Sequence, residues 1–242
     1  MTIKAKNEIL KELKQVGSPA LAKHLMRFFK TGKGEYGEGD LFLGLTVPTQ
    51  RAIIKKYVAD LNLKDIKELL HNKAHEVRLS ALMVLVEKYK QGGKKDKEQI
   101  AKLYFANTKY INNWDLVDLT APAISGDFWF NNSKKLMFDF AKSGYLWKER
   151  IAVVSTYYFI KRGHFDEILK LAEHFLNHKH DLMHKAAGWM LREVGKMDIE
   201  VLRGFLDKHY SVMPRTMLRY SIEKMSETER KKYMNIKMES KL

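Results

Sequence analysis

Apolar residues recur at intervals of three and four along nearly the whole chain, which is the spacing of one face of an α-helix. The runs EVRLSALMVLVEKYK (76–90) and LWKERIAVVSTYYFIKRG (146–163) show this spacing clearly. Strict alternation of apolar and polar residues, the pattern of a half-buried strand, is essentially absent. Short turns containing glycine separate the helical runs. The pattern therefore predicts an all-α protein of roughly a dozen helices.

The helical runs also repeat. Runs that place a basic residue before a small or apolar stretch occur at Arg78, Arg150, Lys185 and Arg215. The first gap is two units of 36 residues with Trp114 at its midpoint, and the later gaps are 35 and 30 residues. Two-helix units of about 30–40 residues are typical of HEAT and armadillo repeats, which stack into an α-solenoid. The sequence therefore predicts an α-solenoid of HEAT-like helical repeats.

The predicted organisation is one domain over residues 1–242, because no Ser- or Gly-rich linker divides the chain. We expect N-terminal helices in 1–31, a mobile Gly-rich loop in 32–40 and repeats in 41–242. The charged stretch 226–242 predicts a final helix with a frayed end.

The repeat spacing also predicts a shared surface. Side chains four residues apart lie one above the other on a helix. Aligned in this way, neighbouring units place six side chains on one stripe: Trp114, Asp118, Arg150, Lys185, Trp189 and Arg192. If these helices are the inner ones, the stripe lines a concave basic groove.

The composition favours a polyanionic partner. Lys and Arg number 44 against 29 Asp and Glu, a formal charge of +15, which points to nucleic acid first and an anionic membrane surface second. There is no cysteine, so disulfides, thiolate chemistry and Cys-based zinc sites are excluded. Because we find neither a signal-peptide pattern nor an apolar run long enough to span a membrane, we expect a cytoplasmic protein.

Five segments resemble the AlkD family of DNA glycosylases, which remove alkylated purines from DNA and are built from HEAT-like repeats. They span most of the chain in the family's order. These segments are LFLGLTVPTQR (41–51), WDLVD (114–118), SGDFW (125–129), LWKERIAV (146–153) and KAAGWMLREVGK (185–196).

The resemblance implies a role for individual residues. Asp118 corresponds to the family's catalytic carboxylate, and Trp114 and Trp189 to the two tryptophans that pack against the deoxyribose of the lesion. Phe28, in MRFFK, is the candidate for an aromatic side chain that reaches the DNA. The residues expected to hold DNA phosphates are Arg150, Arg192 and, from its place on the stripe, Lys185.

The implied reaction is hydrolysis of the N-glycosidic bond of cationic purines, of the N3-methyladenine or N7-methylguanine type, in duplex DNA. Such a base is already a good leaving group, so one carboxylate suffices to stabilise the oxocarbenium-like transition state, and no cofactor or metal is required. The family is thought to act from an open surface without base flipping. We expect a monomer with no obligate protein partner. The alternative is a non-catalytic HEAT-repeat module that binds nucleic acid or a protein.

Two other motifs carry weaker signals. GKGEYG (32–37) fits GxGxxG but follows a helical segment instead of a strand, which argues against a dinucleotide site. Four histidines have a spacing that resembles metal ligands but lack HExxH, so we expect a structural or fortuitous role and no metal site; they are His174, His178, His180 and His184.

Residues near the proposed site have simpler interpretations. We expect Asp115 to cap its helix or face solvent, and Trp129 and Trp147 to be packing residues. Arg78 and Arg215 are expected to be either solvated or in contact with phosphate.

Overall fold

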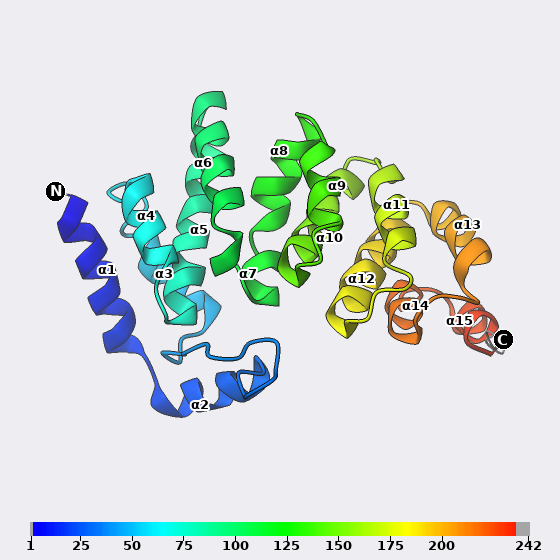
Figure 1. Ribbon diagram of the computed structural model, residues 1–242, viewed down its shortest axis with the longest axis horizontal. Helices are drawn as coiled ribbons and strands as arrows, with labels where there is room; N and C mark the ends of the chain where they lie inside the picture. Colours follow the sequence, from blue (N-terminus) through cyan, green and yellow to red (C-terminus); the bar gives the residue numbers. More distant parts are fainter. Residues whose placement is uncertain (1, 236–242) are drawn as a thin grey trace. The chain divides into compact units, whose positions relative to one another are not determined.

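The computed structural model describes residues 2–235 (Figure 1). By the packing of its backbone, the chain forms two compact units, Met1–Ile124 (unit 1) and Ser125–Leu242 (unit 2). Each unit has its own core, and the organisation as a single domain over 1–242 stays a prediction.

Unit 1 contains seven labelled α-helices and one 3-10 turn within its described residues. They are α1 (Thr2–Val16), α2 (Pro19–Phe28), α3 (Val47–Ile54), α4 (Leu63–Leu70), α5 (His75–Gln91), α6 (Lys94–Ala106), η1 (Thr108–Tyr110) and α7 (Trp114–Asp118). A π-helical turn, η2 (Pro122–Gly126), contains the boundary with unit 2.

Helix α5 is the centre of unit 1. Helices α3, α4, α6 and α7 all pack against it (Figure 1), and residues 75–86 are all buried. A helix covered on every side is apolar all round, which explains the run LSALMVLV. The first turn of α5 nevertheless carries His75, Glu76 and Arg78, and buried charges require partners.

Glu76 finds its partners in the segment between α2 and α3. Its carboxylate accepts hydrogen bonds from the backbone N–H groups of Leu43 at 2.9 Å, Gly44 at 2.8 Å and Leu45 at 3.2 Å. Gly44 has φ +83°, and a Cβ atom there would lie 2.0 Å from the carbonyl oxygen of Ser18, so glycine is required. Glu76 thereby fixes the chain that leads into α3.

The segment 32–40 contains turns and no helix. The N–H groups of Gly32 and Gly34 donate to the carboxylates of Glu35 at 2.8 Å and Glu38 at 2.9 Å. The last residue of the segment, Asp40, is buried, with 5% of its surface exposed. The segment is therefore closed by its own hydrogen bonds and anchored at one end, and its mobility stays a prediction.

Unit 2 is built around a row of three helices. Helix α10 (Leu146–Ile160) packs on α12 (Asp181–Met197), which packs on α14 (Arg215–Ser221). The remaining helices are α8 (Asp127–Phe130), α9 (Lys135–Ala141), α11 (Asp166–His174), α13 (Ile199–His209) and α15 (Glu227–Asn235). Of these, α9 packs on α10, α11 on both α10 and α12, and α13 on α12.

The prediction of an all-α protein is confirmed. The described residues form helices and turns, with one isolated β-bridge between Leu41 and Ala74. None of the described helices combines the length and hydropathy that crossing a membrane requires. A final helix is present as α15, and the predicted frayed end, 236–242, lies outside the described residues.

The helix row of unit 2 is consistent with a helical-repeat fold, whereas a solenoid with a concave groove stays a prediction. The residues that the repeat spacing aligned do not have the same place in their helices. Trp114 and Arg215 are the first residues of α7 and α14, while Arg150 and Lys185 are the fifth residues of α10 and α12. Helix length varies between repeats, so a fixed spacing along the sequence does not preserve the register.

Two glycines of unit 2 provide a test of its helix packing. A Cβ atom on Gly188 would lie 2.5 Å from the carbonyl oxygen of Met217 and 2.6 Å from Tyr220 Cβ, whereas one on Gly204 would meet nothing within 4 Å. We expect Gly188→Ala to lower the free energy of unfolding by about 1–3 kcal/mol, because α12 and α14 must separate. Gly204→Ala should raise it by roughly 0.5–1 kcal/mol through helix propensity. Urea denaturation measures both, and changes of the same sign would contradict the packing described.

Candidate functional site

Helix α7 presents Trp114 and Asp118 on one side. It is five residues long and capped by Asn113, whose side chain accepts a hydrogen bond from the Trp114 N–H at 2.8 Å. Leu116 and Val117 are fully buried, whereas Trp114 and Asp118 are partly exposed. The prediction that these two residues share an accessible face of a helix is therefore confirmed.

Four aromatic side chains form an aromatic row that begins at the surface and ends inside unit 1. Phe28, 57% exposed, packs edge-to-face with Trp114, with ring centroids 5.8 Å apart. Trp114 stacks on the buried Phe29 at 5.0 Å, and Phe29 stacks on Phe42 at 5.1 Å. Unit 1 thus brings together two of the residues proposed to contact the lesion, Phe28 and Trp114.

A charge cluster lies behind the aromatic row. Its members are Asp40, His75, Arg78 and Asp115, all buried. His75 Nδ1 lies 3.0 Å from Asp40 Oδ2, and its Nε2 lies 2.8 Å from Asp115 Oδ2. The face of the imidazole ring stacks on Phe42 with centroids 4.5 Å apart. The histidine therefore bridges two carboxylates that lie 75 residues apart in sequence.

Arg78 completes the charge cluster. Its Nη2 donates to Asp40 Oδ1 at 2.7 Å and to Asn112 Oδ1 at 3.0 Å. Its other guanidinium nitrogens donate to backbone carbonyl oxygens of Asn72, Lys73 and Tyr110. The guanidinium thus ties the loop before α5 to the loop before α7.

The cluster shifts the pKa values of its members. Burial by itself would lower the pKa of His75, but the charge of Asp115 and hydrogen bonds to both carboxylates outweigh it and raise the pKa to about 9. Burial would raise the pKa of Asp40, but His75 and Arg78 hold it below its usual value. At neutral pH the ring is therefore an imidazolium, and both ring nitrogens donate.

Two sequence interpretations are corrected here. Asp115 neither caps α7 nor faces solvent; it is 6% exposed and bound to His75. Arg78 is neither solvated nor placed to contact phosphate, because it is 3% exposed and its donors are used within unit 1.

Unit 2 contains the other predicted site residues. Trp189 is partly exposed and lies beside Tyr157, with ring centroids 6.3 Å apart. Lys185 is on the same helix, α12, and forms an ion pair with Asp181 at 2.8 Å, with 40% of its side chain exposed. Trp189 and Lys185 thus lie on an accessible part of α12.

The two predicted phosphate-binding arginines are engaged within unit 2. Arg150 is 4% exposed and its Nη1 donates to the carbonyl oxygen of Leu182 at 2.6 Å. Arg192 forms an ion pair with Glu223 and lies 3.6 Å from Glu193. We expected Arg150 to lie on the open surface of a groove, whereas it is buried. A DNA phosphate would have to compete with the internal partners of both arginines. Their contact with DNA stays a prediction.

The convergence of residues from the two units on one concave stripe also stays a prediction. The other tryptophans, Trp129 and Trp147, are buried at 0% and 4% exposure, which confirms their role as packing residues. Arg215 donates to the carbonyl oxygen of Met234 at 3.0 Å, so that its guanidinium binds backbone within unit 2.

The four histidines of the stretch 174–184, in unit 2, hold local structure. His178 binds Glu149 at 3.1 Å, His184 binds the carbonyl oxygen of His178 at 2.6 Å, and His180 caps α12 by accepting from the Leu182 N–H. His174 binds the carbonyl oxygen of Ala141 at 3.2 Å. Among the described residues, no group of three or more His, Cys, Asp or Glu is placed to hold a metal ion.

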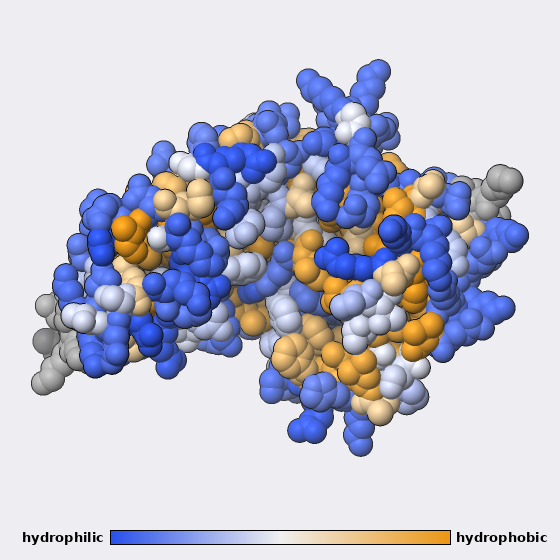
Figure 2. Space-filling model, turned by 180° about the vertical axis from the view of Figure 1, so that it is seen from behind, coloured by the Kyte–Doolittle hydropathy of each residue, from blue (hydrophilic) through white to orange (hydrophobic). Residues whose placement is uncertain are grey.

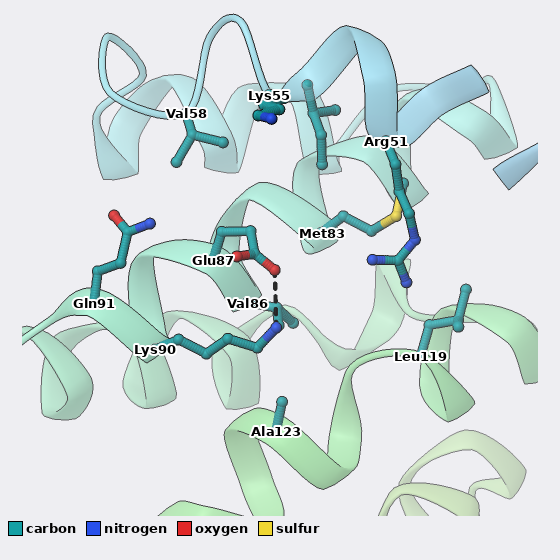
Figure 3. A pocket seen from close by; sticks show the side chains of 11 residues that line it. Arg51, Lys55, Val58, Met83, Val86, Glu87, Lys90, Gln91, Leu119 and Ala123 are labelled. Atoms are coloured by element: carbon teal, nitrogen blue, oxygen red, sulfur yellow. Dashed lines mark hydrogen bonds and ion pairs between the residues drawn. The ribbon is translucent and has the colours of Figure 1, made fainter. Parts of the chain in front are cut away.

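A groove of about 420 Å³ lies between α3, α5 and the start of η2 in unit 1 (Figure 3). Apolar side chains form most of its wall: Ile54, Val58, Met83, Val86, Leu119 and Ala123. Arg51, Lys55 and Lys90 bring positive charge to it, and Lys90 pairs with Glu87 at 2.9 Å. Leu119 directly follows Asp118, so the groove adjoins the end of α7.

Apolar side chains also reach the surface of unit 1. Figure 2 shows them at the lower end of unit 1, where α2 lies in Figure 1, interspersed with hydrophilic residues. The most exposed large ones on α2 and nearby are Met26, Phe28 and Leu41. A surface of aromatic and apolar groups among cations suits a ligand with both charged and apolar parts, as nucleic acid has.

The described helices define an all-α protein, and their packing is consistent with a helical-repeat fold. Residues 9–225 match the family described as "DNA alkylation repair enzyme", and the chain belongs to this family. The sequence-based resemblance to the AlkD-like family is thereby confirmed. Membership supports a role in DNA repair with DNA as the partner.

A solved structure described as "Predicted DNA alkylation repair enzyme from Enterococcus faecalis" has a similar fold. The TM-score is 0.68 with 14% sequence identity, over 87% of this chain and 97% of that one. At this identity the likeness shows the fold alone. No curated protein matches the chain.

The charge cluster was missed at the level of sequence. The available signal was the start of α5, where His75, Glu76 and Arg78 directly precede a helix that is apolar all round. Ionisable residues in the first turn of a helix that is buried on every side require buried partners. Nothing in the sequence indicates that Asp40 and Asp115 are those partners.

The raised pKa of His75 predicts how stability depends on pH. A group whose pKa is higher in the folded protein stabilises it fully below the unfolded value, 6.5, and loses this effect as pH rises through about 9. We expect the free energy of unfolding to fall over this window by on the order of 3 kcal/mol. Urea denaturation at pH 6, 7.5 and 9.5 measures it, with His75→Gln as the control. If the wild type and His75→Gln change in parallel, the ring is not charged in the folded protein.

Proposed function

We propose that the protein is a DNA glycosylase that hydrolyses the N-glycosidic bond of cationic alkylated purines in duplex DNA. One observation carries the proposal: α7 presents a tryptophan and a carboxylate on the same accessible face, with Phe28 against that tryptophan. Family membership supplies the context of DNA repair. The specific substrates proposed are purines methylated at N3 of adenine or N7 of guanine.

The chemistry suits a single carboxylate. The alkylated base is cationic and leaves without a general acid, and positive charge then develops on the deoxyribose. At about 4 Å and an effective dielectric constant near 20, Asp118 would stabilise that charge by roughly 4 kcal/mol, which corresponds to about a thousandfold in rate. The same carboxylate can orient the attacking water.

The aromatic rings would bind the cationic lesion and its sugar. A cation over an indole face gains about 0.5–2 kcal/mol, and Trp114 and Trp189 are both partly exposed. Phe28 extends the aromatic surface of unit 1. Because these groups lie at the surface, they support a reaction without extrusion of the base into a deep pocket.

We infer that Arg51 and Lys55 contribute phosphate contacts in unit 1. Arg51 lies on α3 and Lys55 directly follows it, and both are exposed beside the groove. Among the residues that the structure describes, neither forms an ion pair, in contrast to Arg192 and Lys185. Cations without internal partners lose less on binding a phosphate.

Replacement of Asp118 tests the catalytic part of the proposal. Asp118→Asn removes the charge but keeps the shape, so the single-turnover release of 7-methylguanine from methylated duplex DNA should fall about 100- to 1,000-fold. The affinity for the same DNA should change little. The exposed Asp60→Asn, which removes an equal charge elsewhere in unit 1, is the matched control.

If the wild-type protein releases no methylated purine, the glycosylase proposal is wrong. DNA binding that persists without release would then favour the non-catalytic nucleic-acid-binding module. If Asp118→Asn releases 7-methylguanine as fast as Asp60→Asn does, Asp118 has no catalytic role, although the protein would still be a glycosylase.

Replacement of Arg51 and Lys55 tests the phosphate contacts. The double variant Arg51→Ala/Lys55→Ala should weaken duplex binding regardless of sequence and reduce the slope of log affinity against log salt by about 1.8, which is two contacts at about 0.9 each. The control Lys196→Ala/Lys231→Ala removes two lysines that are paired with Glu193 and Glu227. Equal slopes for the two double variants would contradict this assignment.

A further inference from the structure

Helix α7 is too short to determine its own orientation. A helix of five residues has barely more than one turn, and isolated helices of this length do not form in water. Its position must therefore come from tertiary contacts. The question is which contact decides where Trp114 and Asp118 point.

Apolar packing alone leaves the rotation of α7 loosely determined. Leu116 and Val117 are fully buried, but apolar contacts are non-directional, so that small rotations about the helix axis cost little. A directional contact that joins α7 to α5 is the bond between Asp115 Oδ2 and His75 Nε2, 2.8 Å long. Asp115 Oδ1 is buried and has no hydrogen-bond partner among the described residues. His75 is thus the one described partner of this carboxylate.

The imidazole ring of His75 is itself fixed from several directions. Asp40 holds its Nδ1 at 3.0 Å, and Arg78 holds Asp40 at 2.7 Å. Phe42 stacks on the ring at 4.5 Å, and Phe29 lies 5.0 Å away. The other charged neighbour on α5, Glu76, is turned to backbone N–H groups. The ring therefore offers α7 a rigid anchor.

The same ring also supports Trp114 through the aromatic row. Phe29 contacts His75 on one side and stacks on Trp114 at 5.0 Å, nearly parallel with an interplanar angle of 17°. Trp114 is therefore constrained twice: through the backbone of α7, and through its ring. Both constraints end at His75.

We propose that His75 is a positioning residue that, bound between Asp40 and Asp115, fixes the rotation of α7 and so holds Trp114 and Asp118 toward the DNA. This inference rests on the proposed glycosylase function. His75 does not touch the substrate; it acts through Asp115 and Phe29.

Two substitutions of graded severity test this role. His75→Leu removes both hydrogen bonds, whereas His75→Gln keeps one amide donor for a carboxylate. His71→Gln is the matched control, because His71 is hydrogen-bonded to Asn107 at 2.6 Å and stacked on Tyr110 but has no contact with the charge cluster. Thermal unfolding followed by circular dichroism establishes that each variant is folded. If His75→Leu does not fold, the comparison uses His75→Gln.

Two measurements follow the orientation of α7. The first is the single-turnover release of 7-methylguanine, with duplex affinity measured in parallel. The second needs no activity: the indole N–H signal of Trp114 in nuclear magnetic resonance spectra, assigned with Trp114→Phe. Trp189, in unit 2, serves as the internal reference.

We expect His75→Leu to lower the release rate about 100-fold and His75→Gln about 10-fold, since a displacement near 1 Å has effects of this size. Duplex affinity should stay within about threefold, and the Trp114 signal should move while that of Trp189 does not. His71→Gln should match the wild type in both measurements.

The inference is overturned if folded His75 variants keep the wild-type release rate and the wild-type Trp114 signal. It is also overturned if His71→Gln changes both as much as His75→Gln does, since the effect would then be general loss of stability. If the wild type releases no base, the proposed function fails, and the Trp114 signal alone decides whether His75 positions α7.

Discussion

A buried imidazolium between two carboxylates holds unit 1 together at the point where its candidate site lies. His75 contacts Asp40 Oδ2 at 3.0 Å and Asp115 Oδ2 at 2.8 Å, and Arg78 donates to the other carboxylate oxygen of Asp40, Oδ1. A buried charge without partners is strongly unfavourable, and removing one member of such a cluster exposes the others to that penalty. The cluster therefore specifies one arrangement of the loop before α3, of α5 and of α7.

The aromatic row connects the buried charge cluster to the surface of unit 1. His75 stacks on Phe42, Phe29 contacts both of these rings and stacks on Trp114, and the exposed Phe28 packs edge-to-face with Trp114. Polar bonds in the interior thus determine the position of rings at the exterior. In the proposed function, where a cationic base and its sugar are bound on an open surface, rigidity of this kind would replace the enclosure that a deep pocket provides.

Helix periodicity sufficed to predict the fold class and the common face of Trp114 and Asp118. The run 76–90 became α5, and 146–163 contains α10. The expectations for Asp115 and Arg78 were wrong. Periodicity gives the angle between side chains but does not indicate which of them a neighbouring segment covers. Long cationic side chains add a second difficulty, since Arg78 and Arg150 reach backbone carbonyl oxygens of distant segments. Such partners leave no pattern in a single sequence.

The charge state of His75 can be measured directly. Long-range proton–nitrogen correlation spectra report each imidazole nitrogen separately, and comparison with His75→Gln assigns the signal. At pH 7.5 both ring nitrogens of His75 should carry protons, and they should keep them until the pH approaches about 9. A neutral His75 ring at pH 7.5, with one nitrogen unprotonated, would contradict this prediction.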